Sequence, residues 1–189
     1  MAANTSQEVR IIGGKWKGRK LRFAGDQTLR PTVGRIRETL FNWLRPHIAG
    51  THCLDLFAGS GVLGFEALSQ GAASCHFIES NPRTLRAIKE NADNLASGAR
   101  AQHAKSDALR FLSHTEQRFD IAFLDPPYSK PQLLERALEL IQQRNLVTEF
   151  IYLEARDESL LDAAAERWDA GETKTTRAGD AHAILLCLR

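Results

Sequence analysis

The pattern of apolar and polar positions divides most of the chain into alternating strands and helices. Short apolar runs predict strands at residues 53–57, 75–79, 101–104, 121–124 and 150–154. Helical spacing of apolar positions predicts helices at residues 62–70, 82–95, 108–112, 131–142 and 159–166. Strands and helices that alternate in this way form a parallel sheet covered on both faces. The sequence therefore predicts an α/β fold.

The two ends of the chain depart from this alternation. Two strands near residues 168–176 and 183–188 are expected to pair as an antiparallel hairpin, which completes a mostly parallel seven-stranded sheet. Near the other end, residues 8–12 and 19–23 suit a hairpin across a glycine-rich turn. Thr32 is expected to cap a helix that continues through Leu44. We expect an N-terminal extension, residues 1–48, and a larger domain, residues 49–189.

Charge is unevenly distributed between these two parts. The 189 residues are 43% hydrophobic and 25% charged, as in one ordinary domain with a full core, and the net charge is only +2. Residues 1–45, however, carry ten Lys or Arg against three Asp or Glu. Such a segment, interrupted by Trp16 and glycines, favours contact with nucleic-acid phosphates over a solvated hairpin without a partner. The expected contacts are Arg10, Lys15, Lys17, Arg19, Lys20 and Arg22.

A glycine-rich turn, residues 58–64, follows the first buried strand and precedes a helix. Its Gly59, Gly61 and Gly64 allow a tight turn and close approach of a ligand to the helix start. The spacing also satisfies the dinucleotide pattern G-x-G-x-x-G, and Glu79 lies at a suitable distance to accept hydrogen bonds from ribose hydroxyls. The turn therefore predicts a nucleoside cofactor without deciding which one.

The tetrapeptide Asp-Pro-Pro-Tyr, residues 125–128, follows another buried strand. The Asp125 carboxylate and the Pro126 carbonyl can accept hydrogen bonds from a flat amino group, while Tyr128 stacks on its plane. Two prolines hold the loop in an extended shape, although the same residues also occur as simple strand-ending turns. The arrangement is typical of a site that methylates an amino nitrogen conjugated to a ring or a carbonyl.

The two motifs together favour S-adenosylmethionine over a nicotinamide cofactor. Asp55 precedes the glycine-rich turn, where it would repel a pyrophosphate and attract the cationic end of S-adenosylmethionine. A hydride-transfer site also has no use for two acceptors aimed at an amino group. Both motifs follow parallel strands, so they are expected at the same edge of the sheet. An NAD-dependent oxidoreductase remains the alternative.

Several segments resemble one family. Residues 10–21, 30–32 and 37–42 are similar in order and spacing to the opening signature of the RsmD family, within the Class I S-adenosylmethionine-dependent amino-methyltransferases. With residues 55–61, Glu79 and residues 125–128 the resemblance covers most of the chain, and Gly34 departs from the polar residue expected there. It implies a Rossmann-like fold and a guanine N2 of 16S ribosomal RNA (rRNA) as the target.

Position along the chain assigns roles to individual residues. The expected catalytic residues are Asp125, Pro126 and Tyr128. The expected cofactor-binding residues are Asp55, Phe57, Gly59, Gly61, Glu79, Ser80, Asp107, Ala108 and Asp125. Asp107 suits a contact with the adenine amino group, a helix N-cap, or both, whereas Asn81 and Pro82 are expected to begin a helix. Arg30 and Thr32 join the basic residues as expected RNA contacts.

Other acceptors fit the same tetrapeptide. An adenine-N6 methyltransferase acting on DNA or RNA would use the same residues, because they recognise an amino group and no particular base. A glutamine amide methyltransferase would leave the basic segment without a purpose. A non-catalytic RNA-binding module would need neither the intact glycine-rich turn nor the intact tetrapeptide. Only the N-terminal signature favours guanine in rRNA.

The cysteines, the histidines and the lengths of the apolar runs predict the state of the thiols, metal binding and cellular location. Cys53, Cys75 and Cys187 have no C-x-x-C spacing and are expected to be buried, reduced thiols. The six histidines lack i, i+4 pairing, so no metal is expected. The absence of a long apolar span and of a signal-peptide core predicts a cytoplasmic location and no membrane contact. The expected partner of this monomer is 16S rRNA, within a small ribosomal subunit or its assembly intermediate.

Overall fold

A seven-stranded sheet forms the centre of the computed structural model, which describes residues 6–24, 34–168 and 171–188. The strand order is β5-β4-β3-β6-β7-β9-β8; β9 runs antiparallel to both β7 and β8, and the other pairs are parallel. The strands are β3 (His52–Asp55), β4 (Ser74–Glu79), β5 (Ala101–Lys105), β6 (Phe119–Leu124), β7 (Val147–Ala155), β8 (Glu172–Ala178) and β9 (Ala181–Cys187). The predicted sheet and its C-terminal hairpin are confirmed.

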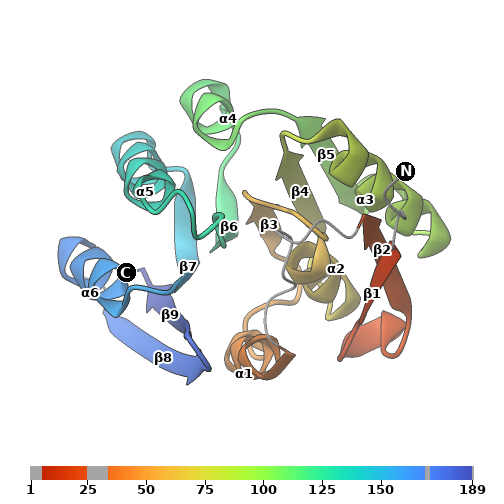
Figure 1. Cartoon of the computed structure of the whole chain (residues 1–189), viewed down its shortest axis with the longest axis horizontal. Helices are drawn as coiled ribbons and strands as arrows, with labels where there is room; N and C mark the ends of the chain where they lie inside the picture. The colour runs from red at the N-terminus through yellow and green to blue at the C-terminus, as the bar shows by residue number, and fades with distance from the viewer. Residues whose placement is uncertain (1–5, 25–33, 169–170, 189) are drawn as a thin grey trace.

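Helices cover both faces of this sheet (Figure 1). On one side lie α1 (Gly34–Leu44), α2 (Val62–Ser69) and α3 (Pro82–Asn94); on the other lie α4 (Ala108–His114), α5 (Gln132–Arg144) and α6 (Glu158–Arg167). Successive strand residues point to opposite faces, so Cys53 packs into the core beneath α2 while Leu54 packs into the core beneath α4 and α5. Burial on both faces explains why the strands read as continuous apolar runs.

Strand boundaries differ from the predicted ones at two places that matter for function. β3 ends at Asp55, two residues before its predicted end, because the chain turns from there into the glycine-rich segment. The backbone N–H of Leu56 still donates to Phe123 O at 3.1 Å, so the exit from β3 stays attached to β6. β7 begins at Val147, three residues earlier than predicted, because polar Thr148 and Glu149 hide its start in the sequence.

The N-terminal residues form the hairpin β1 (Ser6–Arg10) and β2 (Lys20–Ala24), joined through a 3₁₀ turn, η1 (Gly14–Trp16). Its apolar side chains enter the core beneath α1 to α3, where Ile11, Trp16 and Leu21 are buried. A second 3₁₀ turn, η2 (Gly98–Arg100), precedes β5. The hairpin is therefore packed on the main domain and shares its core.

Buried polar contacts fix the turn of this hairpin. The Glu66 carboxylate in α2 accepts the N–H of Ile12 at 2.7 Å and that of Gly13 at 3.0 Å. Ser69 donates to Gly13 O at 2.6 Å and accepts the N–H of Trp16 at 2.8 Å. These bonds satisfy backbone groups that the turn would otherwise bury unpaired. They hold the described N-terminal segment against α2.

Candidate active site

The glycine-rich turn leaves β3 with two residues in the left-handed region. Gly59 has φ 50° and Gly61 has φ 75°, conformations that L side chains rarely adopt. A Cβ on Gly61 would also lie 2.9 Å from Phe65 Cε2, and one on Gly64 would lie 2.3 Å from Phe77 Cε1. The glycines therefore let the turn and the start of α2 pack closely on β4. Gly61 caps α2 without a side chain of its own, and the first turn is partly satisfied within the protein, because the N–H of Val62 donates to Ser60 Oγ at 3.4 Å and that of Gly64 to Asp55 Oδ2 at 3.1 Å.

Asp55, at the end of β3, is buried beneath this turn. Its exposed fraction is 3%, and its Oδ2 accepts the N–H of Gly64 at 3.1 Å. Burial raises the pKa of Asp55 to about 8, against the lowering effect of the Gly64 hydrogen bond. The carboxyl group is therefore mainly protonated at pH 7, and a cation beside it would favour ionisation. The sequence alone predicted an ionised Asp55, because it does not show how burial raises the pKa of this carboxyl group.

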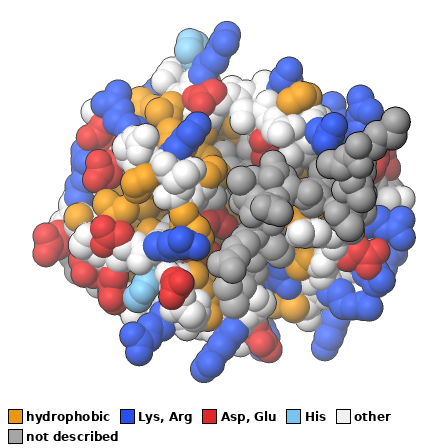
Figure 2. All heavy atoms as spheres, viewed as in Figure 1, with side chains coloured by type: hydrophobic (Ala, Val, Ile, Leu, Met, Phe, Trp, Pro, Cys, Tyr) orange, Lys and Arg blue, Asp and Glu red, His pale blue; other side chains and the backbone are white. Residues whose placement is uncertain are grey.

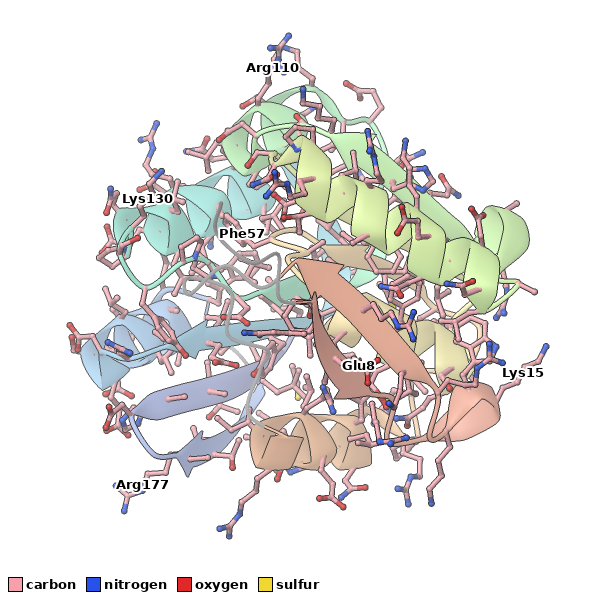
Figure 3. All side chains as sticks on the ribbon, turned by 45° about the vertical axis from the view of Figure 1, so that its right-hand side comes forward. Glu8, Lys15, Phe57, Arg110, Lys130 and Arg177 are labelled. Atoms are coloured by element: carbon pink, nitrogen blue, oxygen red, sulfur yellow. The ribbon has the colours of Figure 1, made fainter. Side chains whose placement is uncertain are left out.

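Glu79 ties the glycine-rich turn to the next strand. It ends β4, and its carboxylate accepts the N–H of Gly59 at 3.1 Å and that of Asn81 at 2.7 Å. A carboxylate has about four lone-pair sites, so both oxygens keep capacity for hydroxyl donors. These acceptor oxygens fit the hydroxyl donors of the ribose of a nucleoside cofactor. Ser80 follows at the surface, and Phe57 packs partly buried near the centre of the view in Figure 3.

Asp107 and Ala108 lie just beyond the carboxyl end of β5. The Asp107 carboxylate accepts the N–H of Arg110 at 3.1 Å, which makes it the N-cap of α4. One oxygen remains for a further donor, as the expected adenine contact requires. The predicted start of α3 is confirmed, because Asn81 accepts the N–H of Arg83 at 2.9 Å and Pro82 opens the helix.

The tetrapeptide of residues 125–128 follows β6 directly. Asp125 is partly buried, Pro126 is buried and Pro127 is exposed. Pro127 O accepts the N–H of Lys130 at 2.9 Å, and this turn leads into α5. Tyr128 is half-buried, with its hydroxyl directed into the protein. The loop thus presents a carboxylate and a fixed aromatic ring beyond the strand end.

Three side chains from β7 and its exit surround Tyr128, and sequence reasoning missed all of them. The Tyr128 hydroxyl donates to Glu154 Oε1 at 2.7 Å, and the Tyr152 hydroxyl donates to Glu154 Oε2 at 2.8 Å. The Arg156 guanidinium lies 4.8 Å from the centroid of the Tyr128 ring. A signal was present in the apolar part of β7, residues 150–155, where a glutamate two residues after a tyrosine shares its face.

The two predicted motifs meet at one edge of the sheet. β3 and β6 are adjacent parallel strands, with Asp55 in register with Phe123, two residues before Asp125. β4 lies on the other side of β3, so Glu79 ends at the same edge. The carboxyl ends of parallel strands commonly form such ligand sites. The expected juxtaposition of the glycine-rich turn and the tetrapeptide is confirmed.

Comparison with known proteins agrees with this geometry. Residues 9–185 match the model of a family described as conserved hypothetical protein 95. The chain is 41% identical to ribosomal RNA small subunit methyltransferase D of Haemophilus influenzae, over 92% of this chain and 91% of that protein. It is 40% identical to the Escherichia coli K12 protein of the same name, over 89% of this chain and 85% of that protein.

The chain belongs to the RsmD family. A solved structure of YhhF from Escherichia coli matches 96% of the chain, and 98% of that chain is covered, with a TM-score of 0.83 and 37% identity. The Thermus thermophilus 16S rRNA N2 G1207 methyltransferase RsmC, in complex with AdoMet and guanosine, has a TM-score of 0.68 at 19% identity, over 98% of this chain and 50% of that one. This second likeness shows the shared fold.

The basic residues of this RsmD-family chain fall into two groups. Lys20 and Arg22 form ion pairs with Glu8, at 2.5 and 3.3 Å. Arg10 donates to Gly18 O at 3.1 Å and Arg19 to Asn94 O at 2.7 Å. Within the described residues, Lys15 and Lys17 form no ion pair, and Lys15 projects outward from η1 in Figure 3. The predicted contacts Arg30 and Thr32 lie outside the described residues.

Lys and Arg side chains lie around the rim of the face in Figure 2, including its right-hand side, where β1 and β2 lie in Figure 1. Next to η1 lies a hollow of about 400 Å³ between the turn, α1 and the end of α2. Its lining includes Lys17, Asn42, Arg45 and Gln70, which bring cations and amides together with the Glu38 carboxylate. The hollow therefore extends the basic surface from the hairpin to α1.

Thiols and histidines play no visible part in the site. Cys53 and Cys75 are buried and Cys187 is partly buried, all three as free thiols. Burial raises the pKa of Cys53 to about 12, which makes it a poor nucleophile. Among the described residues, no group of three or more His, Cys, Asp or Glu is placed to hold a metal ion. In the same part of the RsmD-family chain, no helix is long and apolar enough to span a membrane.

Proposed function

We propose that this protein transfers the methyl group of S-adenosylmethionine to the exocyclic N2 of a guanine in 16S rRNA. The observation that carries the proposal is the position of the glycine-rich turn and the tetrapeptide at the ends of adjacent parallel strands. The names of the relatives, ribosomal RNA small subunit methyltransferase D, support rRNA as the substrate class. We propose that the protein acts as a cytoplasmic monomer, on the small subunit or its assembly intermediate.

Residues at the two motifs have different roles in binding the cofactor and the target base. We assign residues 49–189 to cofactor and base binding, with the Glu79 carboxylate accepting from ribose hydroxyls and Asp107 and Ala108 next to the adenine. Phe57, Gly59, Gly61 and Ser80 complete the contacts with the nucleoside. Asp55 lies beneath the turn, where its ionised form would stabilise a bound cation.

The sulfonium of S-adenosylmethionine supplies an already activated methyl group, so the protein has to supply alignment and exclusion of water. The Asp125 carboxylate and the Pro126 carbonyl would each accept one N–H of the guanine amino group. This orients the nitrogen lone pair out of conjugation and in line with the methyl carbon. Tyr128 would stack on a base that has left its RNA helix. Asp125 would then take the proton that N2 releases when the N–C bond forms.

This proposal is tested by offering tritiated S-adenosylmethionine with four acceptors: deproteinised 16S rRNA, small-subunit assembly particles, DNA and protein. We expect labelling of deproteinised 16S rRNA, of small-subunit assembly particles, or of both, at a guanine N2. Asp125→Ala should lower the rate by about 10²- to 10⁴-fold, because the nucleophile loses its orienting group, while S-adenosylhomocysteine still binds. Label in DNA or protein instead of rRNA, or full turnover by Asp125→Ala, would refute the proposal.

The basic N-terminal segment, residues 1–48, is assigned to RNA binding. Lys15 and Lys17 are its best phosphate contacts, because Lys20 and Arg22 are engaged with Glu8. Each lost phosphate contact should reduce the slope of log affinity against log salt by about 0.7 to 0.9. We expect this reduction for Lys15→Gln with Lys17→Gln, measured by RNA binding at several salt concentrations. Arg177→Gln, in β8 at the edge of the sheet and at the lower left of the view in Figure 3, is the matched control.

A further inference from the structure

Glu154 is a buried carboxylate at the strand end next to the tetrapeptide. Leu153 is in register with Leu124, so Glu154 and Asp125 each follow the last paired residue of neighbouring parallel strands. Only 2% of the Glu154 side chain is exposed. Burying a carboxylate is unfavourable unless hydrogen bonds compensate, and an apolar residue would fill the same space at lower cost. A carboxylate at this position therefore calls for a role beyond packing.

Both oxygens of Glu154 are occupied by phenols. Tyr128 donates to one oxygen at 2.7 Å, and Tyr152, which is completely buried, donates to the other at 2.8 Å. The pKa of Glu154 is raised above its ordinary value, because the effect of burial outweighs the lowering effect of the two hydroxyl donors. Burial and the nearby Glu154 raise the pKa of both phenols, which keeps them as donors at neutral pH. Two hydrogen bonds in different directions fix the Glu154 carboxyl group, and through it the far end of the Tyr128 ring.

Arg156 restrains the same ring on one face. Its guanidinium lies 4.8 Å from the ring centroid, within the range of a cation–π contact. Arg156 is exposed, whereas Glu154 is buried, so the ring is held from the solvent side and from the interior at once. Arg156 therefore occupies one face of the ring, so a flat base would have to stack on the other face.

We propose that Glu154 is a positioning residue for methyl transfer, which acts by fixing the Tyr128 ring so that the acceptor base stacks with its amino group at Asp125. This rests on the proposed function and adds the residue that sets the geometry of the base. The chain holds only two tyrosines, and both bond to Glu154. Any property of the phenols therefore reports on this cluster alone.

Variants of the cluster test the proposal. We expect Glu154→Leu and Tyr128→Phe each to lower single-turnover methyl transfer by about 10- to 100-fold, since a misplacement of about 1 Å costs up to 10²-fold, with unchanged affinity for S-adenosylhomocysteine. The double variant Glu154→Leu with Tyr128→Phe should transfer methyl groups no more slowly than the single variants, because both substitutions remove the same contact. Tyr152→Phe should lower the rate of methyl transfer by a smaller factor, because the hydrogen bond between Tyr128 and Glu154 remains.

A triple variant distinguishes a loss of positioning from a loss of stability. Glu154→Leu combined with Tyr128→Phe and Tyr152→Phe leaves no orphaned polar group, a change that can be nearly neutral for stability. This triple variant should melt close to the wild type and still transfer methyl groups slowly. Wild-type turnover in the triple variant or in Glu154→Leu would overturn the positioning role.

A spectroscopic readout separates this role from the proposed function. In a Tyr152→Phe background, where Tyr128 is the sole tyrosine, ultraviolet titration of phenolate should show Tyr128 ionising at lower pH when Glu154 is replaced by Leu, because the neighbouring carboxyl group is gone. An unchanged titration would show that the carboxylate does not hold the ring, and would overturn the proposal. If the wild type transferred methyl groups to none of the acceptors, the proposed function would be refuted instead.

Discussion

The two halves of the candidate site are built in different ways. At the ends of β3 and β4, backbone groups define the site: glycines turn the chain, and Asp55 and Glu79 accept the N–H groups of Gly64 and Gly59. At the ends of β6 and β7, side chains define it, because Glu154 holds two phenols and Arg156 covers one ring. The first half depends on local conformation, whereas the second depends on contacts between separate segments.

This difference predicts different responses to mutation. Changes in the half at β3 and β4 should act through folding and through the charge of a buried acid. Changes in the half at β6 and β7 should leave the fold largely intact and act on the orientation of one ring. The three variants below test the contrast, in order of decreasing effect on stability.

The largest effect is expected from Asp55→Asn, as a change in pH dependence. The folded pKa of about 8 lies above the ordinary value of 3.8, so between these values the folded protein binds a proton that the unfolded chain has released. Stability should therefore fall as pH rises from about 4 to about 8. Asn has no proton to lose, so the variant should gain several kcal/mol relative to the wild type over this window.

Urea unfolding at intervals of one pH unit from pH 5 to 8 measures this difference. Asp162→Asn, on the exposed side of α6, controls for the loss of one carboxylate. A constant difference between Asp55→Asn and the wild type at every pH would show that Asp55 is ionised throughout, as sequence reasoning alone assumed.

Gly64→Ala should have the next largest effect. The added Cβ would lie 2.3 Å from Phe77 Cε1 and 2.7 Å from Cys75 Sγ, inside a packed core. Overpacking of this kind costs about 1–3 kcal/mol, or roughly 2–4 °C in Tm for each kcal/mol in a chain of this size. Gly34→Ala is the matched control, because its Cβ would meet open space. Equal melting temperatures for the two variants would contradict the close packing of α2 on β4.

The contrast also separates what the sequence reveals from what it conceals. The glycine-rich turn and the tetrapeptide are contiguous, and parallel strands bring their ends to one edge, so both motifs and their juxtaposition were predictable. Glu154 lies 26 residues from Tyr128, and only the pairing of β6 with β7 brings them together. The raised pKa of Asp55 likewise depends on burial, which a motif does not encode.

The N-terminal segment shows the same limit. Its basic composition was visible, but the ion pairs of Lys20 and Arg22 with Glu8 depend on the register of β1 with β2. Its attachment to Glu66 spans more than fifty residues of sequence, since the bond from Ile12 joins positions 54 apart. Contacts at such a distance need the tertiary fold before they can be named.

The smallest effect is expected at the ring of Tyr128. Arg156→Ala removes an exposed cation–π contact worth about 0.5–1 kcal/mol, and Arg110→Ala, which removes a side chain that extends away from the protein in Figure 3, is the control. A double-mutant cycle with Tyr128→Leu isolates the pair, because the loss from Arg156→Ala should shrink once the ring is absent. Additive losses would mean that Arg156 does not restrain the ring, and the half at β6 and β7 would then depend on Glu154 alone.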